Sequence, residues 1–130
     1  MLTLGIDIGT SGVRTAVLES EELVSDARVA HLQQDPANID AEKWWKTVRE
    51  CLTMQGQALR ALGRDLSEIS GIAVDGTSGT MVLTDTELRP TSPALMYNSK
   101  GFEAEAELIA NHVSGPHITK GGNSALARAM

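Results

Sequence analysis

Near its start the chain carries an aspartate, two hydroxyl residues and an arginine in close succession, in the stretch GIDIGTSGVRTAV. Asp7 lies near the end of an apolar run, and the glycine-containing turn GTSG follows it. Backbone N–H groups in such a turn can approach an anion closely, and the hydroxyls add further donors. A carboxylate in this position is a common ligand of Mg²⁺ beside nucleotide phosphates. The candidate phosphate site consists of Asp7, Gly9, Thr10, Ser11 and Arg14.

A simpler explanation of the same stretch is a β-hairpin whose glycines supply positive φ and whose Asp7 only caps the turn. The chain contains neither the pattern G-x-x-x-x-G-K-[ST] nor a G-x-G-x-x-G that passes from a strand into a helix, so the two commonest phosphate loops are absent. Spacing alone leaves the hairpin and the phosphate loop as open alternatives.

A second loop, DGTSGT at 75–80, repeats this chemistry after the short β-branched run ISGIAV. As a structural element, its DG pair is typical of a hairpin turn and its hydroxyls need only be solvated. As a functional element, small polar groups at the end of a buried strand are well placed to bind sugar hydroxyls. Two such loops in one short domain favour the functional interpretation.

The hydrophobic pattern predicts three strands joined by short turns, then a long helix, a buried strand, and a second helix. Asp40 is the expected N-cap of the long helix and Gly63 its stop. Its face with Trp45, Val48, Leu52, Leu59 and Leu62 should be buried, with Cys51 as a structural residue on the same side. The expected strands are 2–8, 13–19, 23–32 and 69–74, with shorter extended runs at 81–83 and 93–98; the expected helices are 41–62, 102–113 and 123–130.

Composition excludes several classes of function. The net charge of −6 argues against a nucleic-acid or anionic-membrane surface, and no apolar run approaches the roughly 20 residues of a membrane span. The single cysteine cannot form an internal disulfide, and the first residues lack the pattern of a signal peptide, so a cytoplasmic protein is expected. The histidines, His31, His112 and His117, have no catalytic partner at suitable spacing and are predicted to be surface or helix-end residues.

The stretch GIDIGTSGVRTAVLE resembles the first phosphate motif of the actin-like ATPase superfamily, which includes sugar kinases, actin and heat-shock ATPases. The stretches ISGIAVDGTSGTMVLTD and RPTSPALMYNSKG are similar to the N-terminal half of FGGY carbohydrate kinases, close to the ribulose and xylulose kinases. The resemblance implies an α/β fold, an incomplete ribonuclease H-like (actin-like ATPase) domain. Its elements are an antiparallel three-strand meander, a crossover helix, and a further strand and helix.

This resemblance also implies roles for individual residues, with ATP and Mg²⁺ as cofactors. Asp7 takes the Mg²⁺ role, and Gly9, Thr10, Ser11 and Arg14 take the nucleotide-phosphate role. The sugar-facing positions are Thr77, Ser78, Gly79 and Thr80 in a first loop and Tyr97 and Asn98 in a second. Many xylulose kinases carry Met-His and Trp-Asn-Asp in these loops, whereas this chain has GTSGTMV and MYNSK, which favours a ribulose-like or unassigned sugar.

We expect residues 1–130 to be the N-terminal part of the first kinase domain, because the final helical pattern has no stop signal and family members are several times longer. A naturally frayed terminus is the alternative. The catalytic aspartate is expected beyond Met130, so the fragment alone should be inactive. An apolar surface left by truncation could make it dimerise. A non-enzymatic actin-like ATP-binding or regulatory module, or a small stand-alone binding module, are the competing functions.

Overall fold

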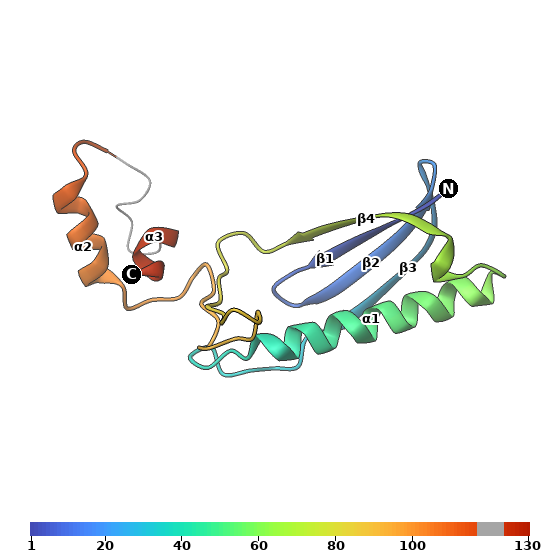
Figure 1. The fold of residues 1–130 in the computed structure, drawn as a ribbon, viewed down its shortest axis with the longest axis horizontal. Helices are drawn as coiled ribbons and strands as arrows, with labels where there is room; N and C mark the ends of the chain where they lie inside the picture. The colour runs from blue at the N-terminus through green and yellow to red at the C-terminus, as the bar shows by residue number, and fades with distance from the viewer. Residues whose placement is uncertain (117–123) are drawn as a thin grey trace. The chain divides into compact units, whose positions relative to one another are not determined.

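The computed structural model describes residues 1–116 and 124–130 and divides into two compact units. Unit 1 comprises Met1–Asp35 and Asp40–Thr77. Unit 2 comprises Pro36–Ile39 and Ser78–Met130. Unit 1 contains a four-stranded sheet with a long helix, and the described residues of unit 2 form loops and two short helices (Figure 1).

The sheet of unit 1 begins with the predicted meander. Strands β1 (Leu2–Ile8), β2 (Gly12–Glu19) and β3 (Glu22–Ala30) pair antiparallel, and β4 (Ile69–Gly76) joins β1 in parallel. The strand order is therefore β3-β2-β1-β4. A parallel pair needs a long crossover connection, which the helix between β3 and β4 supplies. The predicted three-strand meander, crossover helix and further strand are confirmed.

Helix α1 (Ala41–Ala61) has the predicted ends. The Asp40 side chain accepts a hydrogen bond of 2.9 Å from the backbone N–H of Glu42, which satisfies one of the free donors of the first turn. The helix ends at Leu62, and Gly63 follows with φ of +71°. Because a residue with a side chain is strained at this φ, glycine is the natural stop.

The buried face of α1 differs from the predicted one. Trp45 and Leu62 are 53% and 57% exposed, so their expected burial is wrong. The buried positions are Thr47, Val48, Cys51, Gln55, Gly56 and Leu59. A polar residue can occupy such a face when it is hydrogen-bonded. The Gln55 side-chain amide accepts from the hydroxyl of Thr15 on β2, at 2.9 Å, and donates to that of Ser25 on β3.

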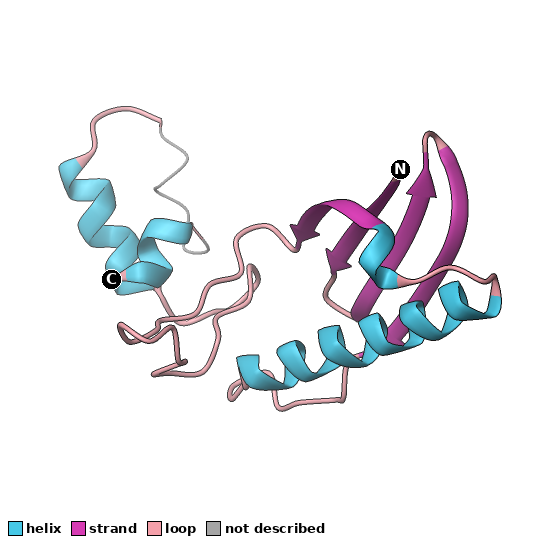
Figure 2. Ribbon diagram, turned by 45° about the vertical axis from the view of Figure 1, so that its right-hand side comes forward, coloured by secondary structure: helices cyan, strands magenta, loops and turns pink. Residues whose placement is uncertain are grey.

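The long helix α1 runs along one face of the sheet (Figure 2), and the core of unit 1 lies between α1 and the strands β1, β2 and β3. One cluster joins Leu59 of α1 to Leu2 and Leu4 of β1 and Val17 of β2. A second cluster joins Val48 and Cys51 of α1 to residues of β2 and β3. The predicted structural role of Cys51 agrees with its complete burial.

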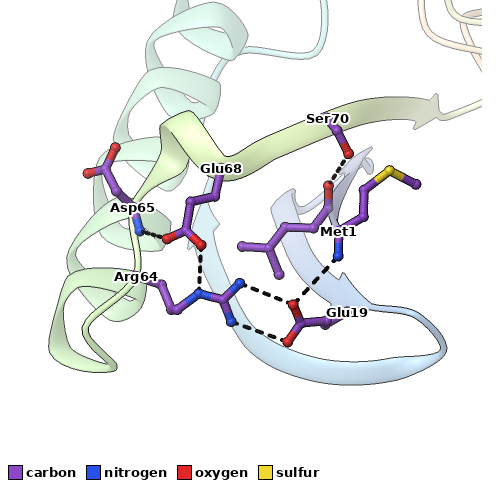
Figure 3. A network of polar contacts seen from close by, with 7 residues as sticks. Met1, Glu19, Arg64, Asp65, Glu68 and Ser70 are labelled. Atoms are coloured by element: carbon purple, nitrogen blue, oxygen red, sulfur yellow. Dashed lines mark hydrogen bonds and ion pairs between the residues drawn. The ribbon is translucent and has the colours of Figure 1, made fainter.

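The end of the sheet opposite the GTSG turn is held by ionic contacts (Figure 3). Arg64 donates to both carboxylate oxygens of Glu19, at 3.2 Å each, and to Glu68 at 2.8 Å. These bonds lower the pKa of Glu19 and Glu68 below the ordinary glutamate value and raise that of Arg64. A 3₁₀-helix η1 (Leu66–Glu68), which the sequence pattern did not predict, begins at Asp65 with a capping box and leads into β4.

Unit 2 has its own small core. Helices α2 (Glu103–His112) and α3 (Ala125–Ala129) pack through Ala106, Ile109 and Ala127. The predicted helix over 102–113 is confirmed apart from its end residues. The predicted helix over 123–130 is confirmed for Ala125–Ala129, and Asn123 lies outside the described residues. No helix in the described part of the chain is long and apolar enough to cross a membrane.

The extended runs predicted at 81–83 and 93–98 do not form regular strands. An isolated bridge pairs Met81 of the first run with Leu95 of the second, and another pairs Ala94 with Ile39; a third bridge, Thr84 with Pro90, lies between the two runs in sequence. Proline has no backbone N–H and cannot donate to a ladder, so Pro90 and Pro93 limit these pairings to single bridges.

Candidate functional site

The GTSG turn connects β1 to β2 at one end of the sheet. The N–H of Gly9 donates to the carbonyl of Gly12 at 3.0 Å, while Thr10 and Ser11 are exposed. The turn closes a β-hairpin, as the simpler explanation expected, but neither Gly9 nor Gly12 is among the described residues with positive φ, so the expected positive φ of these glycines is wrong. Gly12 instead allows β3 to approach closely, since a Cβ there would lie 2.9 Å from the Cα of Ala30 and closer still to the carbonyl oxygen of Val29.

The carboxylate of Asp7 is paired with Arg14. Arg14 Nη1 lies 2.6 Å from Asp7 Oδ2, and the two residues face each other across the β1–β2 ladder. Asp7 therefore binds a side chain and does not act as a simple cap of the turn. A Cβ on Gly9 would lie 3.4 Å from Arg14 Nη1 and 3.7 Å from Asp7 Oδ1, so the turn passes directly beside the ion pair.

The Asp7–Arg14 pair belongs to a charged row across the sheet. Arg28 faces Arg14 from β3, and Asp75 faces Asp7 from β4. Residues opposite one another on neighbouring strands point to the same face, so all four side chains share one face. They line an open groove of about 540 Å³. Asp26 lines the same groove, which therefore presents three anionic and two cationic groups.

The two predicted loops meet at the edge of the sheet where β1 and β4 end. Thr10 Oγ1 lies 3.2 Å from Thr77 Oγ1, and the N–H of Thr77 donates to the carbonyl of Ile8. The carboxyl ends of parallel strands lie at the same edge, which is why residues 67 positions apart in sequence come together. The structure thus brings Asp7, the GTSG turn, Arg14 and Thr77 together within unit 1.

In unit 2 the rest of the first predicted sugar loop lies against the second predicted one. Met81 and Leu95 exchange backbone hydrogen bonds of 2.9 and 2.8 Å. Gly79 has φ of +74°, and a Cβ there would meet Tyr97 Cβ at 3.4 Å. The hydroxyl of Thr80 points to the sulfur of Met96 at 3.9 Å. The predicted sugar positions Gly79, Thr80 and Tyr97 are therefore neighbours.

Tyr97 and Asn98 occupy the middle of a tight turn. The N–H of Ser99 donates to the carbonyl of Met96 at 3.0 Å, and Ser99 Oγ accepts from the Met96 N–H at 2.9 Å. Ser78, Tyr97 and Asn98 are exposed, with Tyr97 48% accessible. Their polar groups are thus free of protein packing and open to a ligand.

Three further residues contact the predicted site residues of their own unit, Asp75 and His31 in unit 1 and Arg128 in unit 2, and none of them was a predicted site residue. Asp75 belongs to the repeated loop DGTSGT in the sequence, but only the parallel register places it beside Asp7. Arg128 of α3 is 6% exposed, donates to the carbonyl of Met96 at 2.9 Å, and would lie 3.1 Å from a Cβ on Gly79. Arg128 therefore contacts both of the loops that are predicted to face the sugar, a contact for which the sequence carries no signal.

His31 is the third of these residues, and the prediction that it is a surface or helix-end residue is wrong. Its side chain is partly buried, and its Nε2 lies 3.0 Å from the carbonyl oxygen of Gly9. It reaches the turn because β3 runs beside β2 and ends near residue 30. His112 is the last residue of α2, as predicted, and His117 lies outside the described residues.

The oxygen ligands in this site fit Mg²⁺ better than a transition metal. Within residues 1–116 and 124–130 no group of three or more histidine, cysteine, aspartate or glutamate side chains could enclose a metal. Mg²⁺ is commonly held by one or two carboxylates together with substrate phosphates and water. Asp7, with Asp75 beside it, supplies that number of carboxylates.

Comparison with known proteins identifies the family of this chain. The family model for the N-terminal domain of the FGGY family of carbohydrate kinases matches residues 2–125. The xylulose kinase of Escherichia coli (strain K12) is 26% identical over an alignment of 130 positions, which covers 91% of this chain and 24% of that protein. The xylulose kinase of Staphylococcus xylosus is 30% identical over 115 residues, which cover 85% and 23%.

A solved structure shows the same fold. The xylulose kinase of Rhodospirillum rubrum superimposes with a TM-score of 0.74 at 21% identity, covering 88% of this chain and 24% of that one. Such kinases have the actin-like ATPase fold, so the predicted fold class is confirmed. The chain spans about a quarter of the length of these relatives. On the match of the family model across nearly all of its residues, the chain belongs to the FGGY family of carbohydrate kinases.

Proposed function

We propose that this chain is the N-terminal part of a kinase that transfers the γ-phosphoryl group of ATP to a hydroxyl of a small sugar. The substrate class is a ketopentose such as xylulose or ribulose, or a related polyol. Family membership supports phosphoryl transfer to a carbohydrate. It also supports the enzymatic interpretation over a regulatory ATP-binding module.

The observation that carries this proposal is the meeting of the two loops at one edge of the sheet. Asp7, Arg14 and the GTSG turn gather beside Thr77, with only 3.2 Å between the Thr10 and Thr77 hydroxyl oxygens. A stand-alone hairpin would give no reason for a second loop of the same composition to meet it. A phosphoryl-transfer site does, because donor and acceptor must be held close together.

Each residue has a definite task in this proposal. Asp7 would hold Mg²⁺, which neutralises phosphate charge when bound. Gly9, Thr10 and Ser11 would surround nucleotide phosphates with N–H and hydroxyl donors, and Arg14 would balance their charge. Because Arg14 already binds Asp7 at 2.6 Å, it also holds that carboxylate in place before the nucleotide arrives.

The sugar would contact the loops 77–80 and 97–98. Thr77, Ser78, Thr80, Tyr97 and Asn98 offer hydroxyl and amide groups, which donate and accept hydrogen bonds as sugar hydroxyls do. Arg128 keeps the two loops together from behind through the Met96 carbonyl. The loops lack the Met-His and Trp-Asn-Asp residues of many xylulose kinases. Ribulose is therefore a candidate substrate alongside xylulose.

We further propose that the 130-residue chain alone does not catalyse the reaction. The base that accepts the proton of the sugar hydroxyl and the residues that hold adenine would come from the remainder of a longer protein. Closure of two domains around the substrates would then exclude water.

The test uses the full-length protein that carries this sequence. ADP release is measured with ATP, Mg²⁺ and a panel of pentuloses and polyols, and the phosphorylated product is identified by mass spectrometry. We expect ADP release that depends on one or a few sugars and is lost in Asp7→Asn. Sugar-independent ADP release, or full activity in Asp7→Asn, would contradict the proposal, and sugar-dependent turnover by residues 1–130 alone would contradict the inactivity.

The isolated chain has an exposed apolar edge through which we propose that it dimerises. Ile72 and Val74 of β4 are 65% and 64% exposed, although they lie opposite Leu4 and Ile6 on the core face of β1. An open apolar edge strand is a common site of self-association. Sedimentation of the chain should show dimers that Val74→Lys converts to monomers; a monomeric parent chain would refute this.

A further inference from the structure

His31 contacts the phosphate turn through both its backbone and its side chain. Its backbone N–H donates to the carbonyl of Ser11 at 3.0 Å, and its Nε2 lies 3.0 Å from the carbonyl of Gly9. A carbonyl oxygen only accepts hydrogen bonds, so Nε2 must carry the hydrogen. His31 therefore donates twice to the turn, on either side of Thr10.

The histidine ring is held from behind by α1. It lies 6.4 Å from the ring of Trp44, centroid to centroid, at an angle of 44°. Its Nδ1 is buried and has no hydrogen-bond partner among the described residues. The contact with Gly9 is thus the one hydrogen bond of this ring that the described part of the chain provides, and the packing against Trp44 directs Nε2 toward the turn.

These two bonds fix the direction of the N–H groups in the turn. In a trans peptide unit the C=O and the N–H point in opposite directions. Because the Gly9 carbonyl points to His31, the N–H of Thr10 in the same peptide unit points away from it. No backbone hydrogen bond within residues 1–116 and 124–130 uses the Thr10 or Ser11 N–H as a donor. These N–H groups remain available for an anion.

We propose that His31 is a positioning residue for the nucleotide-phosphate site. It holds the Gly9–Thr10 and Ser11–Gly12 peptide units so that the free N–H of Thr10 faces the phosphates of ATP. This inference rests on the proposed function of the turn. It adds a residue from the end of β3 to a site otherwise built from β1, β2 and β4.

The experiment compares variants that keep or remove the side-chain donor. His31→Phe keeps an aromatic ring against Trp44 but has no donor, and His31→Gln keeps an N–H donor without the ring. In the full-length protein, His31→Phe should raise the KM for ATP about tenfold, the effect of one lost hydrogen bond. The KM for the sugar should change by less than about twofold, and His31→Gln should recover most of the loss.

A second measurement examines the turn without any nucleotide. In the 130-residue chain, hydrogen exchange of the Thr10 amide and its NMR chemical shift should change in His31→Phe and return toward the parent values in His31→Gln. Urea unfolding of each variant separates this local change from general destabilisation. If His31→Phe does not fold, His31→Leu and His31→Gln provide the same comparison.

The outcomes separate the two proposals. If the parent enzyme neither binds Mg·ATP nor phosphorylates a sugar, the proposed function is wrong, and with it the ligand assigned to this turn. If the parent enzyme binds Mg·ATP and His31→Phe binds it equally well, the positioning role of His31 alone is overturned. If His31→Gln is as impaired as His31→Phe, ring packing and not the N–H donor matters, which also overturns it.

Discussion

Replacement of Gly12 by alanine should be far more damaging than the same change at Gly5, although both glycines lie in neighbouring strands of one sheet. A Cβ on Gly12 would lie 2.9 Å from the Cα of Ala30 and closer to the Val29 carbonyl, both backbone atoms of β3. A Cβ on Gly5 would meet only the carbonyl oxygen of Ala16, at 3.9 Å, which is ordinary contact.

The size of the effect follows from what can move. An ordinary contact begins at 3.4 Å, so β3 would have to shift by about 1 Å to move the Val29 carbonyl oxygen, the nearest atom, away from the Gly12 methyl group. Overpacking of this kind costs about 1–3 kcal/mol, and a paired backbone yields less readily than a side chain, which places Gly12→Ala at the upper end. Alanine recovers about 0.4–1 kcal/mol through the unfolded chain in both variants. We therefore expect a net loss of about 2 kcal/mol for Gly12→Ala and a neutral or slightly favourable change for Gly5→Ala.

The measurement is urea unfolding of the 130-residue chain followed by far-ultraviolet circular dichroism, with Gly5→Ala as the matched control. A lower midpoint at an unchanged m-value reports a change in stability alone. In the full-length enzyme Gly12→Ala should also raise the KM for ATP, since Gly12 closes the turn that Gly9 begins. Equal midpoints for the two variants would refute the reasoning, because they would mean that β2 and β3 are not packed as closely as the structure shows.

Three further predictions concern other contacts. Thr15→Val leaves the side-chain oxygen of Gln55 buried without its donor and should lower the free energy of unfolding in urea by about 1–3 kcal/mol. The loss should be smaller when Thr15→Val is combined with Gln55→Leu, and equal losses in the single and double variants would contradict this. Arg64 lowers the pKa of Glu19, so its stabilisation is present above the ordinary value of 4.5 and is lost as the pH falls through the lowered pKa. Arg64→Met should therefore unfold more easily than the parent at neutral pH and equally easily in strong acid, and a difference that persists in acid would exclude the ion pair as its cause. Arg128→Met should raise the KM for the sugar and leave the KM for ATP nearly unchanged, with partial recovery in Arg128→Lys, whereas an equal rise in both constants would indicate a general folding defect.

Local patterns predicted most of the elements correctly. Alternation of apolar residues gave the strands of the meander, and Asp40 and Gly63 marked the ends of α1 because capping and positive φ depend on neighbouring residues only. The runs at 81–83 and 93–98 were mistaken for strands, since a strand exists only if a partner pairs with it along its length. The buried face of α1 was also misjudged, because Gln55 is buried through bonds to other elements.

The same distinction between local pattern and tertiary contact applies to the candidate site. The sequence by itself determined which residues could hold phosphate and sugar. The residue types of Asp7, the GTSG turn and the DGTSGT loop indicate this chemistry, and so does their resemblance to a family. Only the tertiary structure decided which groups meet. The parallel register placed Asp75 beside Asp7 and Thr77 beside Thr10, and the end of β3 brought His31 to the turn. The packing of α3 brought Arg128 to the predicted sugar loops. Contacts between residues far apart in the chain depend on strand order and helix packing, which no local pattern encodes.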